Sequence, residues 1–416
     1  MKLELLNALD SNALLKEFNS NKLKVADALT RVKIPNKKSE KYRYFDITNV
    51  VQSDLELITT ENIDYKEYGS KFVIEDANLI QAPQNSNLTV EIKAFSDVDL
   101  EHFDGLYFTS HLMAKNVIVI RVTSDTNFEI VHKFTKQKAL INYRVVILVD
   151  TNTHLKVYET FDDASKQSVA LSGYDIFLSR DATIEFIKNQ TLNSGSIVPI
   201  FVSSYKLDSN ANFKLGTFDF TNSNMLNIFR ARLHKYTNFD ATHLLYTNKE
   251  CKAGTVSEIV HLEESAKSNQ NAKNILNDKS RGIFDALIKV TNGGKGTIAH
   301  QNSKAVLLNS GAYMASKPQL EIYIDDLEAS HGSTTGQLDK KALFYLRSRG
   351  ISEVEAKKML ILAFANEAIA TISDEKIANH IYIDFEKAYY GNAELDCIKS
   401  CHSCEDMVLG SEDENN

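Results

Sequence analysis

The residues best suited to metal chemistry are three cysteines near the C-terminus. Cys397, Cys401 and Cys404 follow the spacing C-x3-C-x2-C in the stretch "DCIKSCHSCED". Thiolates at this spacing can hold an iron–sulfur cluster or a zinc ion with a fourth ligand from outside the stretch. Radical-SAM enzymes share the spacing but place it early in a barrel, and no barrel pattern follows here. The other open interpretation is a flexible tail in which the cysteines cluster by chance.

A second candidate is His331 in "EASHGSTTG". Imidazole binds iron and exchanges protons near neutral pH, but a structural histidine bonded to a turn carbonyl is the commoner case. The adjacent Asp325 and Asp326 would point to opposite faces of a strand, which disfavours a paired-carboxylate site. The stretch "NGGKGT" lacks the spacing of a phosphate-binding loop, and no serine-elbow or zinc-protease motif occurs. The sequence therefore predicts no catalytic residues, and we expect a protein that is not an enzyme.

Composition narrows the setting in which these residues act. The 416 residues are 43% hydrophobic and 25% charged, and the net charge of −8 argues against a general nucleic-acid binder. No apolar run approaches the roughly 20 residues that span a bilayer, and the N-terminus lacks the apolar block of a signal peptide. Four cysteines, three of them clustered, do not form a disulfide framework. We expect a cytoplasmic protein with reduced thiols.

The elements that must position these residues fall into four regions. Helical spacing of apolar residues predicts an N-terminal helical region over 1–70. Short alternating segments rich in Val, Ile, Phe and Thr predict a β core over 71–335. Helical patterns return over 336–395, and a Cys-rich acidic tail occupies 396–416.

The β core carries a repeat. The stretches "DTNFEI", "NTHLKV", "DATIEF" and "NANFKL" share a pattern whose first large apolar residues are Phe128, Leu155, Ile184 and Phe213, at nearly even steps along the chain. "DATHLLY" at 240–246 and "KGTIAH" at 295–300 extend the series. A β repeat of this length predicts a solenoid in which each unit stacks on its neighbour. We prefer a parallel β-helix, although a β-sandwich also has evenly spaced strands.

Cap signals divide the C-terminal helical region into three helices. Gly350 is the expected end of the first, and Ser352 with Glu355 forms a capping-box pattern at the start of the second. Ser373 is the expected cap of the third. The three helices could be an end-cap of the solenoid or a module that docks a partner, and the pattern does not separate these two.

The segment 318–369 carries a family resemblance. Its stretches "KPQLEI", "DD", "SHGSTTG" and "LFYLRSRGI" closely resemble the SufB/SufD family of iron–sulfur cluster assembly proteins. The N-terminal "IPNKKSEKYRYFDI" resembles the family's entry motif, with Tyr42 where a tryptophan is expected. The "SHG" after the Asp pair and the lack of a long N-terminal extension resemble the SufD branch.

The resemblance implies a fold and a role. The fold would be mainly β, a right-handed parallel β-helix core flanked by N-terminal and C-terminal helical regions. The role would be a non-catalytic scaffold that pairs with a SufB-like subunit and docks a SufC-like ABC ATPase, or forms a homodimer when isolated. No cofactor would be permanently bound, and a transient iron–sulfur cluster would form at the subunit interface. The remaining alternative is an independent β-helix protein that binds or processes carbohydrate.

The resemblance also assigns residues. His331 matches the histidine implicated at the cluster-assembly interface, and Ala329 stands where many relatives have a cysteine. Any thiolate at that point would come from the partner. The cysteine tail lies beyond the shared region and would be an accessory metal or cluster site. The ATPase-docking segment corresponds to Leu343, Phe344, Tyr345, Leu346, Arg347 and Arg349.

Overall fold

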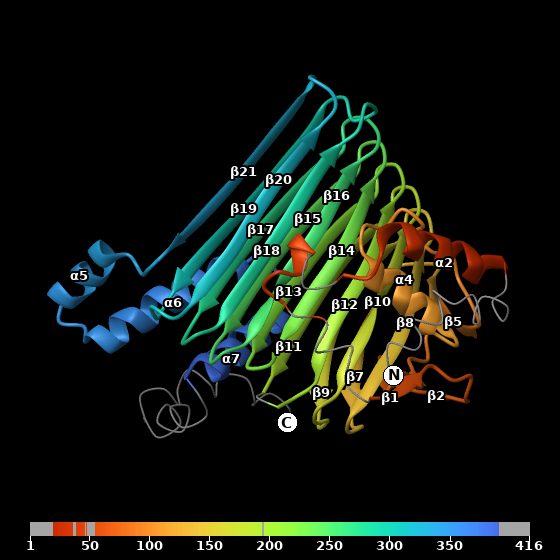
Figure 1. Cartoon of the computed structure of the whole chain (residues 1–416), viewed down its shortest axis with the longest axis horizontal. Helices are drawn as coiled ribbons and strands as arrows, with labels where there is room; N and C mark the ends of the chain where they lie inside the picture. Colours follow the sequence, from red (N-terminus) through yellow and green to blue (C-terminus); the bar gives the residue numbers. More distant parts are fainter. Residues whose placement is uncertain (1–19, 36–38, 46, 48–54, 194, 391–416) are drawn as a thin grey trace, which may run out of the picture.

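The computed structural model describes residues 20–35, 39–45, 47, 55–193 and 195–390. Its body is a solenoid of two sheets that face each other, and the chain alternates between them from β6 onward (Figure 1). All strand pairs between β6 and β21 are parallel, which confirms the parallel β-helix and excludes the β-sandwich.

The two sheets take alternate strands of the chain. The first sheet contains β1 Glu56–Thr59, β5 Leu88–Lys93, β6 Val117–Val122, β8 Ala139–Val149, β10 Val169–Leu178, β12 Val198–Leu207, β14 Met225–Leu233, β16 Lys252–His261, β18 Arg281–Val290 and β20 Tyr313–Ile322. The second sheet contains β2 Lys66–Glu67, β3 Lys71–Glu75, β4 Asn78–Ala82, β7 Thr126–Phe134, β9 His154–Asp163, β11 Thr183–Leu192, β13 Asn212–Thr221, β15 Asn238–Thr247, β17 Lys267–Leu276, β19 Thr297–Leu307 and β21 Leu327–Gly336.

The register confirms the repeat in its middle and corrects it at both ends. Leu155, Ile184 and Phe213 are direct partners on neighbouring strands, as their equal steps along the chain predicted. Phe128 pairs instead with Val157, so the predicted alignment of Phe128 with Leu155 was wrong. Phe213 pairs with Phe239, one residue before the "DATHLLY" stretch. At the far end, the "KGTIAH" stretch is one residue out of phase, because its Ile298 pairs with Lys267 and its Ala299 faces the interior.

Turn geometry explains why Asp and Asn mark the repeat. Asn152, Asp181 and Asn210 have φ values of 59°, 61° and 61° just before their strands. Asn and Asp tolerate this left-handed conformation better than other residues with a side chain. Tyr236 and Ser265 adopt the same conformation, with φ values of 59° and 58°. The turn conformation therefore continues along the solenoid beyond the point at which the Asp or Asn of the sequence pattern is lost.

The N-terminal helices cover the outer face of the first sheet. α2 (Ser20–Val32) and the short helix η2 (Glu40–Tyr42) pack there with α4 (Gly105–Met113). The prediction of a mostly helical region over 1–70 was wrong past residue 55, because β1 and β2 belong to the sheets. α4 was also not foreseen, since it is a helix inside the predicted β core. Every residue of α4 is buried, so it lacks the polar face that reveals a surface helix.

The C-terminal region contains three helices, as predicted. They are α5 (Lys340–Ser348), α6 (Glu353–Ile369) and α7 (Glu375–Tyr390). Gly350, with φ 88°, follows α5, and the Ser352 side chain accepts a hydrogen bond from the Glu355 N–H at the start of α6. Asp374 caps α7 in place of the predicted Ser373, whose hydroxyl bonds to Glu185 of β11.

These helices do not close the end of the solenoid. α6 and α7 pack on the outer face of the second sheet, where they cover Phe218, Phe220, Leu244 and Tyr246. α5 projects from the body (Figure 1), and none of its residues is buried. The end-cap interpretation of the helices is therefore wrong for the described part of the chain. None of the helices in that part is both long and apolar enough to cross a membrane.

Candidate functional site

The solenoid ends in two open strands. β20 is the last strand of the first sheet, β21 is the last of the second, and each pairs with a described strand on one side only. Large apolar side chains are exposed there, with Tyr313 at 41%, Ile322 at 44% and Tyr323 at 54%. Unpaired strand edges offer backbone donors and acceptors to another chain. The open end is therefore a surface on which a second protein can pair.

His331 lies in the middle of β21, at this open end. It pairs with Gln301, a buried residue whose side chain donates to the Gln319 carbonyl inside the solenoid at 2.7 Å. Strand side chains alternate, so His331 shares the inward row of β21 with Leu327 and Ala329, which pack against the core. It is nevertheless exposed, because no further strand covers it in the described chain.

His331 has no side-chain partner among the described residues. Within the described residues its imidazole makes no hydrogen bond or ion pair, and it lies in a strand, so the turn-carbonyl interpretation has no support. No group of three or more His, Cys, Asp or Glu side chains in that part of the chain could hold a metal ion. An iron bound by His331 would need its other ligands from outside the described residues.

The opposite face of β21 has a different chemistry. His300 on β19 contacts the Ser330 hydroxyl at 2.7 Å and lies 3.6 Å from a Glu328 carboxylate oxygen. Both partners alternate with the inward row and so face outward. Asp325 and Asp326 lie in a bend before β21, not on a strand as expected, and Asp326 lies 3.7 Å from Lys295. These residues form no second ligand set at the open end.

α5 presents the predicted docking residues to solvent. Phe344 is 74% exposed and Tyr345 57%, while Leu343 and Leu346 are half-buried. The Arg349 guanidinium lies over the Tyr345 ring at 5.3 Å, and Arg347 pairs with Glu353 at 3.3 Å. The start of α6 adds Val354 and Met359, which are 73% and 47% exposed. We call Phe344, Tyr345, Val354 and Met359 the α5 patch. Exposed apolar side chains in such numbers mark interaction surfaces.

A row of buried polar residues inside the solenoid was not predicted. Glu159, Lys188, Thr217 and His243 are in-register neighbours on four successive strands of the second sheet. All four are buried, and the Lys188 ammonium lies 3.3 Å from the centre of the Phe201 ring. The first three stand four residues after Leu155, Ile184 and Phe213, on the same inward face, so the repeat could have revealed them had it been followed further along each strand.

Burial shifts the pKa values of the ionisable residues in and beside this interior row. Burial lowers the pKa of Lys188, and burial also lowers the pKa of His243 to about 4. Asp219, which accepts from Asn227 at 2.8 Å, has its pKa raised by burial to about 6. Burial opposes ionisation of Glu159, but the hydrogen bond from His132 and the charge of Lys188 hold its pKa below the ordinary value. These groups lie inside the solenoid, on strands away from the open end.

The cysteine-rich candidate site cannot be placed. Cys397, Cys401 and Cys404 lie outside the described residues. The one cysteine within them is Cys251, which is half-buried before β16. Metal binding by the tail stays a prediction.

Comparisons with known proteins agree with the geometry. Residues 132–364 match the family model described as SUF system FeS cluster assembly, SufBD core domain. The chain is similar to the iron-sulfur cluster assembly protein SufD of Escherichia coli, with 38% identity over 32% of this chain and 31% of that protein. It is 26% identical to a SufBD family protein of Synechocystis, over 56% and 53% of the two chains.

A longer match links it to Protein ABCI7, chloroplastic, of Arabidopsis thaliana, with 22% identity over 86% and 84% of the two chains. The matches to the first two relatives span only about a third and a half of their lengths. The matched family model covers more than half of the 416 residues and includes His331. The chain therefore belongs to the SufB/SufD family, and it is SufD-like within that family.

Proposed function

We propose that this protein is a non-catalytic scaffold subunit of a SufBCD-type complex that assembles iron–sulfur clusters. The observation that carries the proposal is His331, an exposed imidazole in the inward row of β21, an edge strand that is paired only on its β19 side. Such a group can contribute one ligand to a cluster but cannot hold it alone. Membership of the SufB/SufD family supports this role over that of a carbohydrate-binding β-helix.

The SufB-like subunit would pair at the open end formed by β20 and β21. Edge strands and the exposed Tyr313, Ile322 and Tyr323 suit a partner that extends both sheets. Ala329 gives this chain no thiol beside His331, so the partner would supply the thiolates. Paired with itself, the same edge would give a homodimer of the isolated chain.

The cluster is the cargo of this scaffold and not a resident cofactor. A neutral imidazole at His331 would ligate iron or take the proton of an incoming thiol, since both roles need a free ring nitrogen. The ligand bond must be weak enough to release the finished cluster. A single histidine from this chain, with the remaining ligands on the partner, meets that requirement.

The SufC-like ATPase would dock on the α5 patch. The predicted docking residues lie in or beside this patch and offer apolar and cationic groups that the body leaves uncovered. They are Leu343, Phe344, Tyr345, Leu346, Arg347 and Arg349. Aromatic and arginine side chains dominate binding energy at protein interfaces. Cluster chemistry on free thiols would favour a reducing compartment, such as the cytoplasm.

Co-purification tests the proposal. The full chain, tagged at its N-terminus, is expressed together with the SufB-like and SufC-like proteins of its own organism. Both partners are expected in the purified complex, with mass and subunit ratio measured by native mass spectrometry. A chain that purifies without either partner under these conditions would contradict the scaffold role.

A further inference from the structure

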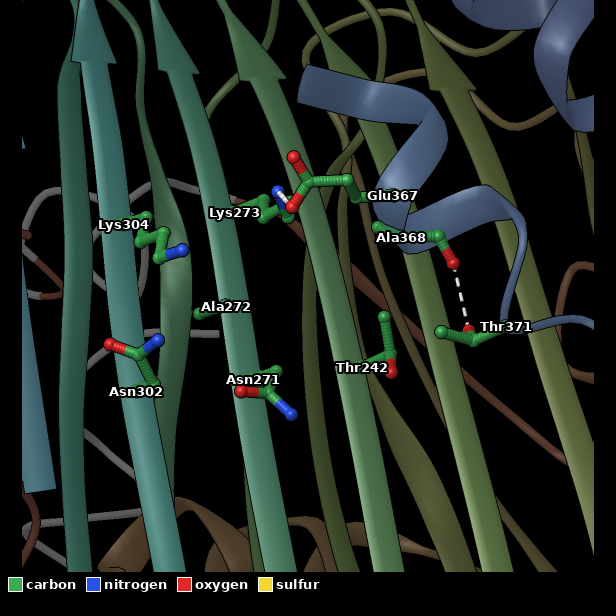
Figure 2. A pocket seen from close by; sticks show the side chains of 9 residues that line it. All are labelled: Thr242, Asn271, Ala272, Lys273, Asn302, Lys304, Glu367, Ala368 and Thr371. Atoms are coloured by element: carbon green, nitrogen blue, oxygen red, sulfur yellow. Dashed lines mark hydrogen bonds and ion pairs between the residues drawn. The ribbon is translucent and has the colours of Figure 1, made fainter. Parts of the chain in front are cut away.

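A groove lies beside the end of α6 on the outer face of the second sheet (Figure 2). Its volume is about 200 Å³, enough for a small molecule. Three neighbouring strands form the floor, and the last turn of α6 forms one wall. His331 lies on the inward face of β21, so the groove is separate from the open-end site.

The floor offers a regular row of polar groups. Thr242, Asn271 and Asn302 are in-register partners on β15, β17 and β19, so their side chains point to the same face about 4.8 Å apart. One Asn271 N–H donates to Asn269 at 3.1 Å, which leaves its second N–H free to bind elsewhere. The Asn302 amide makes no hydrogen bond within the described residues. The next position in the row is Gly332, which has no side chain to fill the groove.

The charges of the groove do not cancel. Lys273 pairs with Glu367 of α6, and its ammonium also lies 4.2 Å from the centre of the Phe364 ring. Lys304 is its in-register neighbour on β19, and its side chain extends toward β17 (Figure 2). The bond from Lys273 and, from further away, the charge of Lys304 lower the pKa of the Glu367 carboxyl, but Lys304 forms no ion pair with a described group. Two lysines and one glutamate leave a net positive charge.

The side chains of the Lys273–Glu367 pair differ in how exposed they are. The Lys273 side chain is only 13% exposed and is fixed between an aromatic ring and a carboxylate, whereas the Glu367 side chain is 64% exposed. An anion entering the groove can therefore displace the carboxylate while the ammonium stays in place. The carbonyl groups at the end of α6 do not repel it strongly, because Ala368 already accepts from the Thr371 hydroxyl at 2.8 Å.

We propose that this groove binds a small oxyanion, a carboxylate or phosphate group, between Lys304, Asn302 and Asn271. The ammonium groups of Lys304 and Lys273 supply the charge, and the Asn302 amide, whose nitrogen is turned toward β17 in Figure 2, supplies a directional N–H donor. The site goes beyond the scaffold role, since it needs neither the partner subunits nor a cluster.

Titration of the isolated full chain with inorganic phosphate and with malonate, followed by calorimetry at low ionic strength, tests the site. Binding with one site per chain is expected for at least one of the two probes. Preference for phosphate or for malonate separates the two sources of the oxyanion. Saturation by neither probe in the millimolar range overturns the proposal.

Matched variants locate the binding. Lys304→Gln is expected to weaken it about tenfold, because one charge-assisted bond is lost. Lys267→Gln, on β17 but away from the groove, is expected to change nothing. Glu367→Gln is expected to strengthen binding several-fold, because the competing carboxylate is removed. Equal affinity in the Lys304 and Lys267 variants, or weaker binding after Glu367→Gln, overturns the assignment.

Discussion

At the scale of single residues, position on a strand decides what each side chain can do. His331 and His300 are one residue out of phase on adjacent strands, and this difference sends them to opposite faces of the second sheet. His300 has a hydroxyl and a carboxylate beside it, whereas His331 has no partner among the described residues. A free imidazole at an open edge is suited to an incoming ligand, and a paired one is not.

The first prediction concerns His331. His331→Ala is expected to leave the complex assembled, because the side chain is exposed and makes no hydrogen bond or ion pair within the described residues. Cluster content is expected to fall about tenfold or more, since loss of even an outer partner of a metal ligand costs that much in affinity. Iron and acid-labile sulfide per complex are measured after co-expression with all partners.

His300→Ala is the matched control, because it removes a histidine one strand away on the opposite face. It is expected to keep normal cluster content. Equal cluster content in the His331 and wild-type complexes would make His331 structural. Native mass spectrometry of both variants must first show the wild-type subunit ratio.

A second residue-scale prediction concerns the tail. If Cys397, Cys401 and Cys404 bind a cluster, anaerobic reconstitution of the isolated chain should give the sulfur-to-iron charge-transfer absorbance of a thiolate-bound cluster. The triple Ser variant is expected to lose that absorbance, whereas Cys251→Ser is expected to retain it. An unchanged spectrum in the triple variant would return the tail to the interpretation of chance clustering.

At the scale of elements, the sequence predicts the α5–α6 boundary better than it predicts strand register along the whole solenoid. Gly350 and Ser352 act within a few residues of themselves, so the sequence places the α5–α6 boundary well. The repeat was recognised where Leu155, Ile184 and Phe213 are all large. It failed at Phe128 and Ile298, because an apolar residue one or two positions away imitates the row, and only pairing with neighbours settles the phase.

At the candidate site too, the sequence identifies single residues but not the neighbours that strand pairing gives them. The sequence and its family resemblance singled out His331 but could not show that its strand is open, because that depends on how all earlier strands stack. The groove of Figure 2 was missed for the same reason, since Thr242, Asn271 and Asn302 meet only through register. Sequence separation between such residues hides their proximity.

The third prediction concerns α5. The double change Phe344→Asp with Tyr345→Asp is expected to weaken ATPase binding about 100-fold, since truncating interface aromatics commonly costs about 2–4 kcal/mol. Both side chains are exposed, so the thermal unfolding temperature should stay unchanged. Tyr236→Asp, at an exposed tyrosine in a solenoid turn, is the control. Wild-type ATPase affinity of the double variant, measured by biolayer interferometry, would place docking elsewhere.

Point changes test docking better than removal of 338–416. That deletion would uncover the outer face of the second sheet, where α6 and α7 bury Phe218, Phe220, Leu244 and Tyr246. The apolar side chains exposed by the deletion would favour aggregation. Loss of ATPase binding would then not identify the docking surface. The double change in α5 leaves the α6–α7 contact with the sheet intact.

At the scale of the whole molecule, the solenoid interior is not uniformly apolar. Ile, Val and Phe fill much of it, but the early strands β7 and β9 already bury His132 and Glu159, and later strands add Lys188, Asp219, His243 and Gln270. His243 is held by Thr217 at 2.8 Å and Gln270 at 3.1 Å. Buried polar groups are tolerated when they are paired in this way. Because the protonation of these groups changes with pH, the free energy of unfolding should change with pH as well.

The last prediction is acid destabilisation through buried histidines. Burial lowers the pKa of His243 and of His261 to about 4, below the ordinary value of about 6.5 in the unfolded chain. The unfolded state therefore binds more protons between about pH 6.5 and 4. The stability that each neutral histidine contributes is complete above about pH 6.5 and is lost as the pH falls toward 4. At pH 5 the loss should be about 1–2 kcal/mol for each histidine.

Urea unfolding at pH 7 and pH 5 measures this loss, and His243→Gln isolates one contribution. Glutamine can keep a bond to Thr217 or Gln270 but takes up no proton, so the variant should lose about 1–2 kcal/mol less than wild type over this pH interval. His331→Gln replaces an exposed histidine and should lose as much as wild type. If His243→Gln instead matches wild type at both pH values, His243 does not stay neutral in the folded solenoid, and the acid sensitivity must come from other buried groups.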